Sequence, residues 1–411
     1  AIMTTPSNQL AAAKMATSTI PTAPTTMPEP APAPAPAPAI VPIPPRGVDY
    51  RGKVVLAPMV RSGELPSRLL ALHYGADLVW GPETVDRALI GTTRRTNPRT
   101  GMLEWARMPS NNHSKPASAP AENVIYRLDP VHEVGRLVFQ IGTSDPARAV
   151  AAARLVAGDV AGIDVNAGCP KSFSTSGGMG AALLQTPDTL VAILEALVRE
   201  IAPEFGVGIS VKIRLLETQE LTVALVRRLV ATGITGLTVH CRTTPMRPRE
   251  PAIRGQLKVV ADVCREAGVA CVMNGDVTGR TQAEALVEEY GVDGAMIATA
   301  AEKNPSCFAA GVKLAPWEEV VGRYLRFAVE VENKWGNTKF MIQQMIPGKT
   351  PGFQELMSCK SYAPLVEKLG LGEELLDKAK VVDALMGLDQ REMQAREKKA
   401  PEKRKMSGEE E

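Results

Sequence analysis

Short apolar runs recur along the chain, and each has the length of one buried strand. Helical patterns with a period near 3.6 residues fill most of the gaps between them, for example at 146–157 and 221–232. The runs cover residues 54–57, 77–80, 137–140, 162–165, 209–213, 236–240, 270–274 and 294–298. Eight such βα units predict a (β/α)8 TIM barrel in the α/β class. An open doubly wound sheet is less favoured, because no G-x-G-x-x-G follows the first strand.

The pattern changes on both sides of this region and divides the chain into four parts. Residues 1–47 are rich in proline and alanine, which predicts a disordered extension. Residues 48–315 are predicted to form the barrel. Residues 316–388 show helical periodicity without strands, which predicts a smaller all-helical domain. The last part, 389–411, is almost entirely polar, and we expect a charged, disordered tail.

One gap between predicted strands is unusually long. Residues 88–123 contain several prolines together with Arg94, Arg95 and Arg99, and they predict a long, partly mobile insertion. Arginines near a barrel mouth favour contacts with a phosphate backbone, although solvated side chains are the simpler interpretation.

Composition limits the cofactors and the compartment. Six cysteines without a C-x-x-C pair argue against a disulfide scaffold and a structural zinc site, so we predict no metal and a reducing compartment. No apolar stretch is long enough to span a membrane. The first 45 residues contain one lysine and no arginine, which disfavours mitochondrial targeting. We therefore expect a cytoplasmic protein, with the nucleus as a second location.

The segment that follows the fourth predicted strand carries the clearest chemical signal. Cys169 lies between Gly168 and Pro170, and Lys171 and a polar, glycine-rich stretch to Gly180 come next. Packing does not require this composition, whereas barrels place reactive groups on loops at the carboxyl ends of strands. We predict that Cys169 is reactive, and an inert buried thiol is the alternative.

Polar residues also end most of the other predicted strands, where they should face one site. A basic, amide-rich ring around one thiol suits an anionic, planar ligand such as FMN, with its phosphate near the last two strands. The candidate ring consists of Ala57, Pro58, Met59, Gln140, Asn166, Lys171, Lys212, Arg214, His240, Arg242, Asn274, Gly275, Asp276, Ala298 and Thr299. His240 alone would be read as a structural histidine, but a lysine inside an apolar strand, Lys212, is hard to explain by packing.

Several of these motifs together resemble the flavin-dependent tRNA-dihydrouridine synthases. They are the N-x-G-C-P-K loop that begins at Asn166, the V-K-I-R run at 211–214, the V-H-C-R run at 239–242 and the A-P-M run at 57–59. The resemblance extends over residues 54–371 and is greatest to the eukaryotic branch that acts on position 20 of the D-loop. It implies that NADPH reduces FMN, and that reduced FMN transfers a hydride to C6 of a tRNA uridine.

The resemblance also implies roles for single residues. Cys169 matches the acid that protonates C5. Lys212 and His240 would contact the flavin, while Gln140 and residues 274–276 would hold its ring, ribityl chain and phosphate together with the ends of the first and last strands. The substrate would be held by Asn166, Lys171, Arg214 and Arg242. We expect a monomer whose partner is tRNA.

The sequence departs from that family at two positions, and two other functions stay open. Cys241 stands where the family usually has glycine, and Thr299 stands where the position-20 branch usually has arginine. The phosphate would then depend on backbone groups, the Thr299 hydroxyl or another cation. The alternatives are an FMN-dependent oxidoreductase of a free pyrimidine and a non-catalytic RNA-binding flavoprotein.

Overall fold

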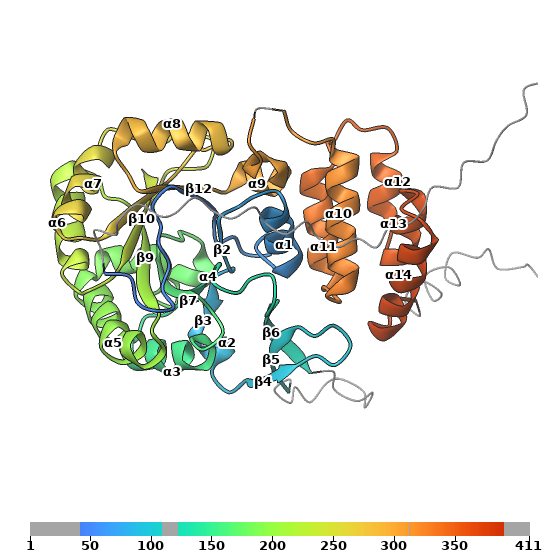
Figure 1. Ribbon diagram of the computed structural model, residues 1–411, viewed down its shortest axis with the longest axis horizontal. Helices are drawn as coiled ribbons and strands as arrows, with labels where there is room; N and C mark the ends of the chain where they lie inside the picture. Colours follow the sequence, from blue (N-terminus) through green and yellow to red (C-terminus); the bar gives the residue numbers. More distant parts are fainter. Residues whose placement is uncertain (1–41, 109–121, 312, 390–411) are drawn as a thin grey trace, which may run out of the picture. The chain divides into compact units, whose positions relative to one another are not determined.

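The computed structural model describes residues 42–108, 122–311 and 313–389, so the predicted extension and tail lie almost wholly outside the described residues. Eight parallel strands close into a barrel, because β2 pairs with both β1 and β7 (Figure 1). These strands are β1 (Lys53–Leu56), β2 (Leu78–Trp80), β7 (Leu137–Gly142), β8 (Gly162–Ala167), β9 (Gly208–Leu215), β10 (Gly236–Thr243), β11 (Ala270–Asn274) and β12 (Gly294–Ile297). The eight predicted strands and the barrel are therefore confirmed.

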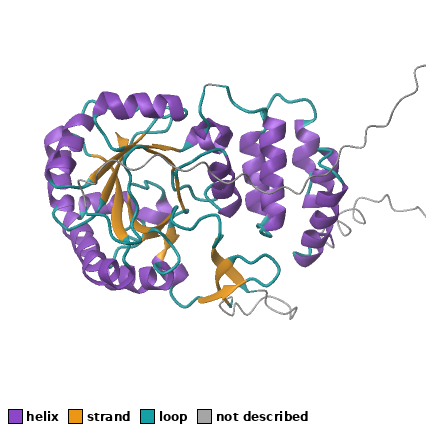
Figure 2. Cartoon of the chain, in the orientation of Figure 1, coloured by secondary structure: helices purple, strands orange, loops and turns teal. Residues whose placement is uncertain are grey.

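Helices surround the strands, as Figure 2 shows. Two of them begin where the sequence offers a cap, since Asp145 accepts a hydrogen bond from the Arg148 amide and Thr218 accepts one from the Leu221 amide. The helices of this region are α1 (Leu65–His73), α2 (Asp86–Leu89), α3 (Pro146–Val156), α4 (Ser172–Thr175), α5 (Pro187–Phe205), α6 (Gln219–Val230), α7 (Leu257–Glu266), α8 (Arg280–Tyr290) and α9 (Thr299–Lys303), with 3-10 turns η1 (Gly180–Gln185) and η2 (Pro305–Phe308).

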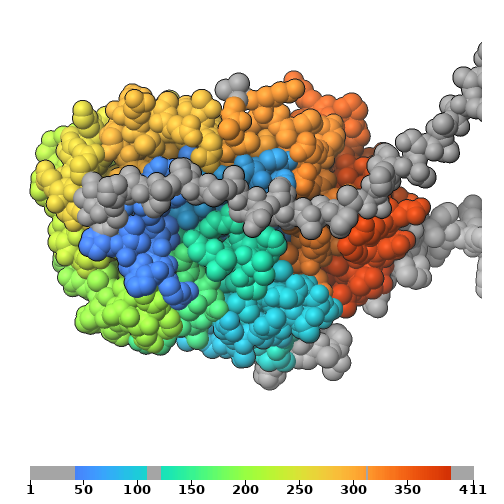
Figure 3. All heavy atoms as spheres, viewed as in Figure 1, coloured from blue at the N-terminus to red at the C-terminus, as the bar shows by residue number. Residues whose placement is uncertain are grey.

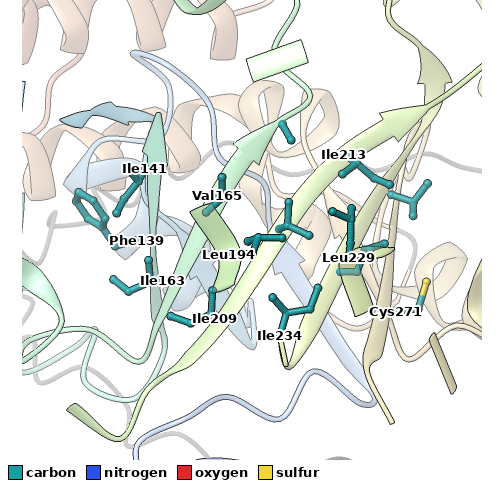
Figure 4. Packing of buried hydrophobic residues seen from close by; sticks show 14 of the residues in the cluster. Phe139, Ile141, Ile163, Val165, Leu194, Ile209, Ile213, Leu229, Ile234 and Cys271 are labelled. Carbon is teal, nitrogen blue, oxygen red and sulfur yellow. The ribbon is translucent and has the colours of Figure 1, made fainter. Parts of the chain in front are cut away.

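Alternation along each strand separates an apolar layer from a polar interior. In β9, Ile209 and Ile213 belong to the cluster that packs against the helices (Figure 4). Because successive side chains of a strand point to opposite faces, the residues between them, Ser210 and Lys212, face the interior of the barrel. The same alternation directs the polar residues of β7, β8, β10 and β11 inward.

The end of the barrel at which the strands begin is filled by side chains, and the segment that precedes β1 closes it. Tyr50 and Trp80 pack there with a small apolar cluster, and their ring centroids lie 5.9 Å apart. Gly236 is required beside Tyr50, because a Cβ at this position would lie 2.5 Å from the tyrosine ring. Arg46 donates hydrogen bonds to the carbonyls of residues 157, 158, 160 and 205, and Figure 3 shows this segment in blue against green residues. Arg46 is therefore part of the barrel region, although the predicted boundary lies at 48.

The insertion contains a three-stranded antiparallel sheet of β4 (Thr93–Thr96), β5 (Leu103–Arg107) and β6 (Asn123–Leu128). The sequence did not predict these strands, and residues 109–121 of the insertion lie outside the described part. The three arginines are paired with carboxylates: Arg94 with Asp159, Arg95 with Glu104 and Arg99 with Glu332. The pairs of Arg94 and Arg99 brace the insertion against the rest of the protein, while the Arg95 pair lies within the small sheet. The edge strand β4, which reads T-R-R-T and is mostly exposed, gives little local signal because it lacks alternating apolar residues.

Residues after Pro316 form the predicted helices. They are α10 (Trp317–Glu330), α11 (Trp335–Met345), α12 (Phe353–Ser358), α13 (Tyr362–Lys368) and α14 (Glu373–Leu385). The described residues of the barrel region also include a short strand, β3 (Thr84–Val85). The helices share an apolar core, which Leu70 of α1 joins. Inside it, Tyr362 donates to the Asn333 carbonyl at 2.7 Å and lies 2.7 Å from the Thr338 hydroxyl. None of the helices in the described residues is long and apolar enough to cross a membrane.

Candidate active site

Strand register places the polar interior residues side by side at the carboxyl end of the barrel. Lys212 of β9 is in register with Asn166 of β8, and one step further Arg214 is in register with His240 of β10. His240 is in turn in register with Asn274 of β11. Residues separated by more than a hundred positions in sequence thus form one ring, as the strand-end pattern predicts.

A cavity of about 410 Å³ lies at the ends of β9 to β12. This volume is within the usual range for a cofactor site. The predicted residues that line it are Arg214, His240, Arg242, Asn274, Gly275, Asp276, Ala298 and Thr299. Its further lining residues are Pro248, Val277, Thr278, Ala300 and Lys303. Lys303 is a cation one helical turn beyond Thr299, and that spacing was the available signal.

The other predicted residues do not line this cavity but lie on adjoining strand ends and loops. Ala57 follows β1 and its amide donates to the Ile297 carbonyl of β12, while Met59 accepts from the Gly63 amide at 2.7 Å. Pro58 lies between them, and Lys171 is exposed on the loop after β8. The remaining members are Gln140, Asn166, Cys169 and Lys212, whose contacts follow.

Arg242 is an organising residue of the site rather than a free cation. It is buried, and its guanidinium donates to the carbonyls of Glu250 and Pro248 and, at 2.5 Å, to Asp276. Its Nη1 lies 3.2 Å from His240 Nε2. Because arginine only donates, the imidazole must accept at Nε2, which places its proton on Nδ1.

His240 is accordingly a neutral hydrogen-bond donor. Burial, together with the positive charges of Lys212 and Arg214, lowers its pKa to about 2. The ring therefore cannot serve as an acid at neutral pH, but its Nδ1–H can donate to an acceptor in the cavity.

The loop after β11 needs glycine at its first position, residue 275. Gly275 has φ +124°, and a Cβ there would lie 3.2 Å from the Ala252 Cβ and 3.4 Å from the Cys241 Cβ. Asp276 accepts from Arg242 and, at 2.7 Å, from the Ala252 amide, so both of its oxygens hold the loop. A ligand can consequently approach the Gly275 backbone closely.

A buried carboxylate lies one layer below the ring. Asp164 is fully buried and accepts from Gln140 Nε2 at 2.8 Å and from the Ser210 hydroxyl at 2.7 Å. Burial raises its pKa to about 6. Burial and the charge of Arg214 lower the pKa of Lys212 to about 8, while Asp164 opposes this decrease. Gln140 is thus oriented from below, by a residue that the strand-end pattern did not include.

The Cys169 loop is held by two of the predicted substrate residues. Asn166 Oδ1 accepts from the Gly168 amide at 2.9 Å and from the Cys169 amide at 3.0 Å. Arg214 Nε donates to the Gly168 carbonyl at 2.8 Å. Burial and the carboxylate of Glu83 raise the pKa of the Cys169 thiol and outweigh Lys171, which lowers it. Glu83 was not among the predicted site residues.

Comparisons with known proteins show which family this chain resembles in sequence. The family model described as "Dihydrouridine synthase (Dus)" matches residues 55–363. The "tRNA-dihydrouridine(20) synthase [NAD(P)+]" of Schizosaccharomyces pombe is 50% identical over 304 residues, which are 73% of this chain and 61% of that protein. The protein of the same name from Saccharomyces cerevisiae is 44% identical over 321 residues, 76% of this chain and 82% of that one. A solved 2-naphthoyl-CoA reductase complex has a TM-score of 0.41 at 12% identity over 74% of this chain and 55% of its own.

Proposed function

Because this chain belongs to the dihydrouridine synthase family, we propose that it reduces the C5–C6 bond of a D-loop uridine of tRNA, at position 20. The observation that carries the proposal is a half-buried thiol, Cys169, fixed by Asn166 and Arg214 beside a cavity at the carboxyl end of the barrel. The chain spans 61% of the first relative and 82% of the second, so the activity of the whole protein is part of the proposal.

The polar groups of the cavity and of the adjoining strand β9 fit FMN. The Nδ1–H of neutral His240 and the ammonium of Lys212 suit the acceptor atoms of an isoalloxazine. Gly275 leaves its backbone open, and Thr299 and Lys303 supply a hydroxyl and a charge for a phosphate. The position-20 branch usually has an arginine at the position of Thr299. In this chain Lys303 would supply the positive charge of that arginine. Bound FMN, reduced by NADPH, would supply the hydride for C6.

The residues of this chain would then donate the proton and hold its donor in place. Cys169 donates it to C5, which requires a neutral thiol, and its raised pKa favours that form. Asn166 and Arg214 keep the loop of Cys169 in place through backbone hydrogen bonds. Asn166 and Arg214 would contact the uracil through polar atoms that do not take part in these backbone hydrogen bonds. Lys171 and Arg242 would also contact it through polar atoms of their side chains.

We further propose that the helical region is a separate domain and that it contacts tRNA. We also propose that the enzyme is a monomer and that it is cytoplasmic. Among the described residues, Lys349 and Lys360 are exposed there and have no ion-pair partner. Lys334 and Lys339 instead donate to backbone carbonyls of the protein. Unpaired lysines favour phosphate contacts, whereas the paired arginines of the insertion favour bracing.

The test is the dihydrouridine content of unmodified tRNA after incubation with purified protein, FMN and NADPH, measured by nucleoside mass spectrometry. We expect product with the wild type and with Cys359→Ala, a buried cysteine of the helical region, and a loss of at least a hundredfold with Cys169→Ala. Product from Cys169→Ala at the wild-type rate would overturn the assignment of the acid. A yellow protein that oxidises NADPH without modifying tRNA would instead favour a free pyrimidine as substrate.

A further inference from the structure

A carboxylate reaches the Cys169 loop from a part of the chain that carries no catalytic motif. Glu83 follows β2 and directly precedes β3, and β3 pairs in parallel with the end of β7, where Val85 is in register with Gly142. The Glu83 side chain lies over this glycine, because a Cβ at Gly142 would stand 2.5 Å from Glu83 Oε1. Any larger residue at 142 would displace the carboxylate.

The glycine-rich segment after Cys169 completes the enclosure of Glu83. Ser174 is fully buried and its hydroxyl donates to Glu83 Oε1 at 2.9 Å. The segment then turns back, so that the Ala181 amide donates to the Cys169 carbonyl at 2.9 Å. Gly180 has φ +58°, and a Cβ there would collide with the Ser174 hydroxyl and lie 3.2 Å from the Cys169 Cβ. Ser174, Cys169 and Glu83 are thus packed together.

The second oxygen of Glu83 has no hydrogen-bond partner. Oε2 is buried, and no described residue donates to it. A buried, unpaired carboxylate oxygen has a free-energy cost, so its retention beside a reactive thiol needs an explanation. Burial raises the pKa of Glu83, while the Ser174 hydroxyl, the Asn166 side chain and the Cys169 side chain lower it.

The charges that face Cys169 explain why a carboxylate is useful here. Lys171 on the same loop and Lys212 and Arg214 on β9 are positive, and positive charge favours a thiolate. Glu83 is the acidic group that faces the thiol from β2–β3, and a neighbouring negative charge disfavours a thiolate. Without Glu83, burial alone would oppose three cations.

We propose that Glu83 is a positioning residue that keeps the Cys169 side chain protonated, and so able to act as an acid, in a site otherwise rich in positive charge. In the donation step the S–H bond breaks, its electron pair stays on sulfur, and a C5–H bond forms. The resulting thiolate is disfavoured beside Glu83 and recovers a proton from solvent water. The substrate in this step rests on the proposed function, whereas the effect of Glu83 on the thiol does not.

The experiment measures the thiol directly. Purified FMN-loaded protein is treated with iodoacetamide between pH 6 and 10.5, and alkylation of Cys169 is followed by peptide mass spectrometry. Cys169 is the one cysteine of the six that is not buried, so its reaction is resolved from the others. We expect the midpoint for the wild type to lie above the ordinary thiol value of about 8.5, and Glu83→Gln to lower it by about one unit.

Two further variants separate charge from structure. Glu83→Asp keeps the charge and should keep a high midpoint, and Glu217→Gln removes an exposed carboxylate elsewhere and should match the wild type. The alkaline limit of uridine reduction should move with the midpoint in Glu83→Gln. A wild-type midpoint at or below 8.5, an unchanged midpoint in Glu83→Gln, or equal decreases in the Gln and Asp variants would each overturn the inference. A shifted midpoint in a protein that makes no dihydrouridine supports the role of Glu83 and overturns the proposed function.

Discussion

The ion pair between Arg68 and Glu133 joins the first barrel helix, α1, to the loop between β6 and β7. Both side chains are 1% exposed, and Arg68 Nε lies 2.5 Å from Glu133 Oε1. The guanidinium also donates to the Gly63 carbonyl at 3.0 Å and to the Arg127 carbonyl at 2.8 Å. Arg68 therefore holds the turn after β1, at the mouth of the barrel, together with β6.

Arg68→Met removes the charge and these hydrogen bonds while keeping most of the apolar stem. Glu133 would remain buried with one described hydrogen bond to its carboxylate, from the Asp129 amide at 3.0 Å. Breaking a buried pair in this way typically costs about 3–5 kcal/mol, because one charge is left without compensation. Replacing both partners, in Arg68→Met/Glu133→Leu, removes the uncompensated charge and should restore most of that loss.

Urea unfolding at pH 7.5 and 25 °C, followed by circular dichroism, measures the free energy of unfolding of the three proteins. We expect a decrease of about 3–5 kcal/mol for Arg68→Met and a smaller decrease for the double variant. A single variant within about 1 kcal/mol of the wild type, or a double variant that is no more stable than the single one, would refute this account of the pair.

Two more predictions concern the site itself. Burial raises the pKa of Asp164 to about 6, so its ionisation destabilises the folded state as pH rises from about 4 to about 6. The variant Asp164→Asn should therefore become more stable than the wild type across that range. In urea unfolding at pH 7.5 the difference in the free energy of unfolding should reach roughly 3 kcal/mol. A difference that does not change between pH 4 and pH 7.5 would contradict this assignment. Gly275→Ala should weaken FMN binding at least tenfold in a flavin-fluorescence titration, because its Cβ would press on Ala252 and Cys241 at a positive φ, whereas Gly255→Ala, which meets no atom within 4 Å, should bind like the wild type.

Local patterns were sufficient for the barrel and for most of the ring at its mouth. Strand periodicity fixes which residues point inward, and the rule that polar residues at strand ends share a site then brings Lys212, His240 and Asn274 together. The same reasoning failed for the insertion. Its edge strand carries Arg94 and Arg95, whose partners could not be identified from neighbouring residues.

The sequence by itself therefore determined the architecture, the place of Cys169 on the loop after a strand and the set of polar residues around it, because these follow from periodicities of two and 3.6 residues and from residue type. Only the tertiary structure decided how those residues are used. Arg242 proved to be hydrogen-bonded to its own loop and to His240, and Asp164 proved to lie beneath Gln140. No local pattern identifies Glu83 as a site residue. The pairing of β3 with β7 brings it to the loop of Cys169, which is 86 positions away in the chain. Charge at a site depends on distances in space, and these are set by packing rather than by spacing along the chain.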